Sequence, residues 1–111
     1  MQREGGSVGR RLPPLGKQLR GWRESRGMAL RQLARRLGVS HVYLYEVETG
    51  RRRLSEKRLV HFAEMYGFNA DELRALDGRI APDIEEWLAD NVAVVHELRR
   101  RMERSEGGRE R

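Results

Sequence analysis

The sequence predicts an all-α protein, with a domain of five short helices and a C-terminal helical extension. Apolar residues recur at the three- and four-residue spacing of helices from Leu15 to Met102. Glycines follow several of these segments, as they commonly do where helices end. No strand-like alternation of apolar and polar residues persists beyond five positions. We therefore expect helices joined by short turns and no sheet.

The first helix is predicted to begin at Leu15. Residues 1–14 are rich in Gly, Arg and Pro and lack periodicity, so we expect a flexible basic arm there. Leu15, Leu19 and Trp22 then share one helical face, because they are spaced by four and three residues. Gly27 is predicted to end this helix.

The second and third helices are predicted to be separated by a tight turn. The second covers 30–37 and ends at Gly38, with arginines on its exposed face. Ser40 offers a side-chain oxygen to cap the third helix, which continues to about Thr49. Gly50 follows and closes it. Two short helices joined by a tight turn form a recurrent structural motif, and the residues around this turn are considered below.

Two further helices are predicted to complete the domain. Ser55 caps a fourth helix that runs to about Tyr66. Asn69, with Glu72 three residues later, resembles a capping box and predicts a short fifth helix ending near Leu76.

Residues 78–104 are predicted to form a helical extension to the domain of residues 15–77. Pro82 suits the first turn of a helix, and Asp90-Asn91 interrupts the helical pattern. The final segment, 105–111, is charged and contains Gly-Gly, so we expect it to be disordered.

The composition argues against several classes of protein. There is no cysteine, so disulfides, thiolate catalysis and sulfur-ligated zinc are excluded. No apolar run reaches the roughly 18 residues of a membrane helix, and the N-terminus lacks the apolar segment of a signal peptide. The three histidines have no metal-binding spacing, and no catalytic motif appears. We therefore expect a cytoplasmic protein that is not an enzyme, requires no cofactor and does not bind a membrane.

Positive charge is concentrated in the predicted domain. Residues 1–69 carry 15 basic and 6 acidic side chains, whereas residues 70–111 carry 8 and 11. The first part of the chain is therefore the part expected to bind a polyanion such as DNA.

The residues around the tight turn predict a helix-turn-helix. Ala34 is small where two helices cross closely, and Gly38 tolerates positive φ in the turn. Val39, Leu44 and Val47 are apolar where the third helix must contact the core. An ordinary helical hairpin is the alternative, but it does not require this spacing.

Leu15 to Leu76 resembles the phage-repressor-like (XRE/Cro/CI) helix-turn-helix regulators. The matching stretches are LGKQLRGWRESRGM, LRQLARRLGVS, HVYLYEVETGRRR and SEKRLVHFAEMYGFNADEL. The resemblance implies a five-helix domain whose third helix enters the major groove of DNA, usually as a dimer on a near-palindromic site. Leu30 departs from the family, which usually has a phosphate-contacting glutamine there.

The resemblance also implies roles for individual residues. Arg23 is expected to pair with Glu48 and to fix the third helix; the alternative is that each is separately solvated. Glu46 departs from the residues usual at its position, but a carboxylate can accept a hydrogen bond from cytosine N4. Expected contacts to bases or nearby phosphates come from Ser40, His41, Val42 and Glu46. Expected contacts to the DNA backbone come from Tyr43, Thr49, Arg51 and Arg52. Tyr45 is added because it should face outward, where its hydroxyl can bind a phosphate.

The extension carries more apolar surface than a free helix leaves in water. It can fold back on the domain, pair with a second copy or bind another protein; we favour homodimerisation, because one domain reads too few base pairs. The candidate dimer contacts are Ile84, Trp87, Leu88, Val92, Val95 and Leu98. We expect a dimeric transcriptional repressor of bacterial or phage origin that binds double-stranded DNA. The alternative is an antitoxin or regulatory adaptor that binds a protein through these helices.

Overall fold

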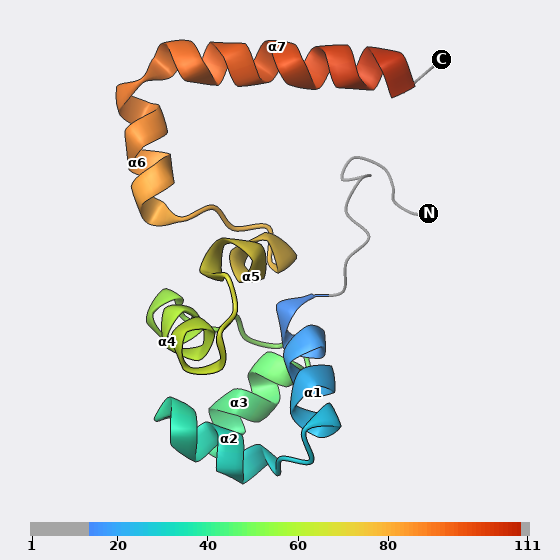
Figure 1. Cartoon of the computed structure of the whole chain (residues 1–111), viewed down its shortest axis with the longest axis vertical. Helices are drawn as coiled ribbons and strands as arrows, with labels where there is room; N and C mark the ends of the chain where they lie inside the picture. The colour runs from blue at the N-terminus through green and yellow to red at the C-terminus, as the bar shows by residue number, and fades with distance from the viewer. Residues whose placement is uncertain (1–13, 110–111) are drawn as a thin grey trace. The chain divides into compact units, whose positions relative to one another are not determined.

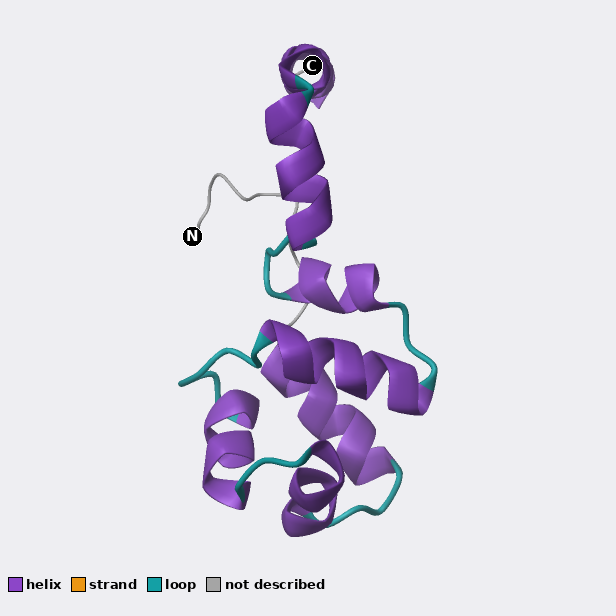
Figure 2. Cartoon of the chain, turned by 90° about the vertical axis from the view of Figure 1, so that its left-hand side faces the viewer, coloured by secondary structure: helices purple, strands orange, loops and turns teal. Residues whose placement is uncertain are grey.

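The computed structural model describes residues 14–109, and all regular elements within them are α-helices (Figure 2). The predicted arm, residues 1–14, lies outside the described residues except for Pro14. The helices, labelled in Figure 1, are α1 (Leu15–Ser25), α2 (Leu30–Leu37), α3 (His41–Glu48), α4 (Glu56–Tyr66), α5 (Ala70–Leu76), α6 (Pro82–Asp90) and α7 (Val92–Arg109). The all-α prediction is confirmed.

The chain divides into two compact units. The first, here called the headpiece, contains α1–α5 and ends at Arg79. The second, here called the C-terminal unit, begins at Ile80 and contains α6 and α7. Each unit is described separately below.

The headpiece has one apolar core, to which all five helices or their connections contribute. Within it α3 packs against α1 and α2, and α5 packs against α1 and α4. Trp22 extends the core by edge contacts with Phe62, Tyr66 and Phe68, at centroid distances of 5.2, 4.6 and 5.8 Å. The buried apolar residues are Leu15, Leu19, Leu33, Ala34, Leu37, Leu44, Val47, Leu54, Leu59, Phe62, Ala63 and Leu73.

Side-chain caps begin three of the headpiece helices, as their residue types predict. Each cap oxygen accepts a hydrogen bond from a backbone N–H in the first turn, which would otherwise lack a partner. The pairs are Ser40 with Tyr43 (3.0 Å), Ser55 with Arg58 (3.2 Å) and Asn69 with Glu72 (3.0 Å). These caps determine where the turns between the helices stop.

The tight turn between α2 and α3 has the predicted geometry. Gly38 has φ +73°, in the left-handed region that favours glycine. The N–H of Val39 donates to the carbonyl oxygen of Ala34 at 3.0 Å, which closes the end of α2. Ala34, Leu44 and Val47 are all buried. The helix-turn-helix scaffold is therefore present.

The end of α7 differs from the sequence-based expectation. Disorder was expected from Ser105, but α7 continues to Arg109. Glycine lowers helix propensity by about 1 kcal/mol per residue without blocking the backbone hydrogen bond, whereas proline would block it. The Gly-Gly pair alone therefore did not define the end of the helix.

Candidate DNA-binding surface

Helix α3 has one buried side and one exposed side. Leu44 and Val47 are buried in the core, whereas Val42 is 55% and Tyr45 51% exposed. Apolar and aromatic side chains left in solvent on a short helix indicate a contact surface. The exposed side of α3 is therefore the candidate binding surface, and the buried side explains how it is held in place.

Arg23 and Glu48 join α1 to the end of α3. Arg23 Nε donates to Glu48 Oε2 at 2.7 Å, and Nη2 donates to Oε1 at 3.0 Å. Arg23 Nη1 also donates to the carbonyl oxygen of Met28 at 2.6 Å. The hydrogen bonds that Arg23 donates to Glu48 raise the pKa of Arg23 and outweigh the opposing effect of burial. Both side chains of this bidentate ion pair are largely buried, and the pair fixes the orientation of α3.

The N-terminus of α3 borders a shallow hollow of about 270 Å³. Arg31 and Arg35 of α2 line it together with Ser40 and His41 of α3. The hollow thus combines two arginines with the end of a helix that carries partial positive charge. It is a suitable place for an anion at the edge of the candidate surface.

Two hydroxyl groups expected near the DNA backbone make contacts within the protein. The Tyr43 hydroxyl accepts a hydrogen bond from the N–H of Ser55 at 2.9 Å and donates to the carbonyl oxygen of Arg53 at 3.4 Å. The Thr49 hydroxyl donates to the carbonyl oxygen of Tyr45 at 2.9 Å. In this structure both groups hold the end of α3 and the loop that follows it.

The three consecutive arginines after α3 have different partners. The Arg51 side chain is exposed and has no ion-pair partner among the described residues. Arg52 Nε donates to Glu46 Oε1 at 2.9 Å. Arg53 Nη2 donates to the carbonyl oxygen of Asp77 at 2.8 Å and thereby ties the loop to the end of α5. Of the three, Arg51 is therefore the arginine whose charge remains available to a ligand.

Leu30 is half-buried and packs against the core. It therefore contributes to the scaffold at the position where the resembling regulators have a polar residue.

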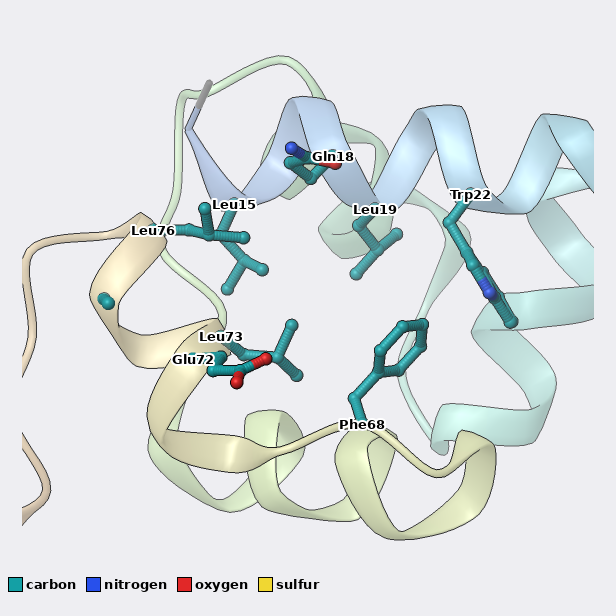
Figure 3. A pocket seen from close by; sticks show the side chains of 9 residues that line it. Leu15, Gln18, Leu19, Trp22, Phe68, Glu72, Leu73 and Leu76 are labelled. Carbon is teal, nitrogen blue, oxygen red and sulfur yellow. The ribbon is translucent and has the colours of Figure 1, made fainter. Parts of the chain in front are cut away.

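A cavity in the headpiece lies away from the exposed side of α3. It has a volume of about 460 Å³ and lies between α1 and α5 (Figure 3). Its lining is mainly apolar, and Leu19, Trp22, Phe68 and Leu73 point toward it (Figure 3). No residue of α3 lines this cavity, so it is not part of the candidate binding surface.

A family model described as a helix-turn-helix domain matches residues 14–76, which is more than half of the chain. The chain belongs to this helix-turn-helix family. Membership indicates DNA as a partner in a family that is typically non-enzymatic. No curated protein and no solved structure matches the chain significantly.

The helix-turn-helix domain depends on contacts that sequence reasoning did not identify. Gly16 lies so close to α3 that a β-carbon there would overlap the carbonyl oxygen of Val47. Arg58 Nη1 donates to the carbonyl oxygen of Leu37 at 3.2 Å and so supports the end of α2. Both contacts join residues more than 20 positions apart. Local patterns carry no signal for such pairs, although a glycine inside a helix marks a position to inspect.

Helices α6 and α7 lie beyond the matched helix-turn-helix domain. None of the α6 side chains is buried, and Trp87 is 54% exposed. Of the six dimer candidates, Leu88 and Val95 are half-buried. The exposed candidates are Ile84, Trp87, Val92 and Leu98.

Other kinds of site are not found in the described part of the chain. No group of three or more His, Asp or Glu side chains there could hold a metal ion. Among the same residues, no helix is long and apolar enough to cross a membrane.

Proposed function

We propose that this protein is a sequence-specific transcriptional regulator of the phage-repressor-like (XRE/Cro/CI) type. It acts as a dimeric repressor in the bacterial cytoplasm and inserts α3 into the major groove of double-stranded DNA. The observation that carries the proposal is the exposed side of α3, where Val42 and Tyr45 are held in solvent by a buried anchor. Packing of α3 against the core does not require apolar and aromatic side chains on its exposed side.

The base-reading residues lie in the first two turns of α3 in this proposal. Val42 packs on a thymine methyl group, and Glu46 accepts a hydrogen bond from a cytosine amino group. Ser40 and His41, beside the hollow lined by two arginines, contact a phosphate at the N-terminus of the helix. Tyr45 gives its hydroxyl to the DNA backbone.

The C-terminal unit provides the dimer contacts in this proposal. No side chain of α6 is buried, and Trp87 is the largest of the apolar side chains that this unit leaves exposed. Pairing with the same unit of a second copy would cover them and bring two headpieces to one site. Two-fold pairing would double the number of base pairs that are read.

Selection from random duplexes tests the proposal directly. A dimeric regulator will enrich a motif of two related half-sites, because the symmetry of the protein is repeated in its DNA. A single half-site would indicate a monomeric reader. A chain that binds no duplex even at low salt would overturn the proposal.

Salt dependence tests the phosphate contacts. Arg51→Ala is expected to weaken binding to all sequences and to lower the slope of log K against log salt by about one per headpiece. The matched control is Arg99→Ala, which removes an exposed arginine from α7 and should leave the slope unchanged. An unaltered slope in Arg51→Ala would show that Arg51 contacts no phosphate.

The exposed side chains of Trp87 and Val92 also suit a second function. The protein would then be an antitoxin or regulatory adaptor whose C-terminal unit binds a different protein. Sedimentation of the purified chain separates the two cases. A dimer supports the regulator, and a chain that stays monomeric at high concentration supports the adaptor.

A further inference from the structure

Glu46 and Arg52 form an ion pair on the exposed side of α3. Arg52 Nε donates to Glu46 Oε1 at 2.9 Å, and the two side chains are 55% and 32% exposed. The Arg52 guanidinium also lies over the Tyr43 ring, with Cζ 5.4 Å from the centroid. One arginine thus contacts both a carboxylate and an aromatic ring of the same short helix.

The backbone after α3 places Arg52 at this position. The N–H groups of Arg51 and Arg52 both donate to the carbonyl oxygen of Glu46, at 2.8 and 3.2 Å. The chain therefore folds back over the residue whose side chain Arg52 contacts. The Tyr43 ring beneath Arg52 is itself fixed, because its hydroxyl is bonded to the loop at Ser55. The backbone fold and the Tyr43 ring therefore bring the two charged side chains next to each other.

An exposed ion pair of this kind adds little to the stability of a fold. The pair matters more for how a carboxylate that faces DNA binds a base than for the stability of the fold. The Arg52 charge offsets the repulsion between Glu46 and phosphates, and the hydrogen bond favours one orientation of the carboxylate. The second oxygen, Oε2, has no hydrogen-bond partner among the described residues, and so it stays available to a base.

We propose that Arg52 is a positioning residue that holds Glu46 for recognition of a cytosine amino group, and that it does not act mainly as a phosphate contact. The inference rests on the proposed function, because it requires that α3 reads bases. It assigns Arg51 and Arg52 to different tasks, although they are adjacent and chemically identical. Arg51 would contribute attraction to any DNA, and Arg52 would contribute discrimination at one base pair.

The test starts from motifs selected from random duplexes by the full-length wild-type protein and by Glu46→Gln. The position at which the two motifs differ identifies the base pair that Glu46 reads. Affinities are then measured for two duplexes, one with the preferred base at that position and one with it replaced. The proteins compared are wild type, Arg51→Ala, Arg52→Ala, Glu46→Gln and the Arg52→Ala/Glu46→Gln double variant.

The affinity ratio between the two duplexes is the decisive quantity. Arg51→Ala should weaken binding to both duplexes by the same factor and leave the ratio unchanged. Arg52→Ala should reduce the ratio by about tenfold, the discrimination typical of one good base contact. The double variant should match Glu46→Gln, because Arg52 acts through Glu46. Discrimination at a base pair read by Val42 should not change, which separates positioning from a general loss of structure.

Each contrary result has a distinct meaning. A wild-type protein that enriches no motif overturns the proposed function and this inference with it. A wild-type motif that Arg52→Ala preserves, with equal weakening on both duplexes, overturns the inference alone. A Glu46→Gln motif identical to that of wild type also overturns it, because Glu46 would then read nothing.

Discussion

At position 16 the backbone of α1 meets the last turn of α3, with no room for a side chain between them. A β-carbon on Gly16 would overlap the carbonyl oxygen of Val47 and lie 2.9 Å from the Val47 carbonyl carbon. The atoms in the way belong to the backbone, so they cannot move aside by a change of rotamer. Gly16→Ala is therefore expected to lower the free energy of unfolding by about 3 kcal/mol, near the upper end of overpacking effects.

Gly21 in the same helix provides the control. A β-carbon there would meet nothing within 4 Å. Gly21→Ala is expected to raise the free energy of unfolding by about 0.5–1 kcal/mol, because alanine favours the helix more than glycine does. Urea denaturation followed by circular dichroism measures both changes. Equal effects of the two substitutions would contradict the close approach of α1 and α3.

The sequence identified some residue contacts of the site and missed others. The Arg23–Glu48 pair was expected from the resemblance to known regulators, which supplied a contact across 25 positions. The pairing of Glu46 with Arg52 was not expected, because it depends on how the loop after α3 folds back. Composition predicted a basic segment at Arg51–Arg53. It could not predict which of its charges are already paired.

At the scale of elements, a charged cluster joins α4 to α5. Arg74 Nε donates to Glu56 Oε2 at 3.0 Å, and Arg74 Nη1 donates to Asp71 Oδ1 at 2.8 Å. The hydrogen bond from Arg74 is the main cause that lowers the pKa of Glu56 below its ordinary value. The same contact raises the pKa of Arg74. The cluster therefore favours the charged form of Glu56 in the folded protein.

This cluster predicts a loss of stability in acid. A carboxyl group whose pKa is lowered by folding stabilises the fold above its unfolded-state pKa, and this contribution is lost as pH falls through the lower folded-state value. Because Glu56 is 39% exposed, screening by water keeps the contribution within about 1 kcal/mol. Glu56→Gln should reduce the acid dependence of the melting temperature measured below about pH 5. Glu64→Gln, on the same helix, is the matched control and should keep the wild-type dependence.

Helix starts were predictable, and so were the ends of α2 and α4, where Gly38 and Gly67 adopt positive φ. Ser40, Ser55 and Asn69 each begin a helix through one local hydrogen bond, so their residue types carry the signal. The end of α7 lacks such a signal, and the sequence-based expectation of disorder from Ser105 differs from a helix that reaches Arg109. Packing between helices, such as α1 on α3, depends on contacts that are distant in sequence. The packing of α1 on α3 was predictable only through the resemblance, whereas the crossing of α2 and α3 was predicted from the residues around the turn.

At the scale of the whole molecule, the headpiece has a buried core, whereas the C-terminal unit leaves apolar side chains in solvent. Trp87 is the largest of these and is 54% exposed. If the unit forms the dimer, Trp87→Ala is expected to raise the dimer dissociation constant by tenfold or more, because buried tryptophans often dominate interfaces. Sedimentation equilibrium measures this change.

Tyr45→Ala is the matched control for that experiment, since Tyr45 is also aromatic and 51% exposed but lies on α3. It should weaken DNA binding and leave the dimer dissociation constant unchanged. If Trp87→Ala sediments as wild type does, the dimer contacts lie elsewhere.

The chain has two tryptophans, and each unit contains one. Trp22 lies among Phe62, Tyr66 and Phe68 in the headpiece, whereas Trp87 lies in solvent on α6. Their fluorescence therefore separates events that occur in different parts of the molecule. In a Trp87→Phe variant the emission reports the unfolding of the headpiece alone. In the wild-type protein, the fluorescence emission should shift to shorter wavelength with rising concentration if α6 becomes covered. An unchanged circular dichroism spectrum would show that the fold stays intact.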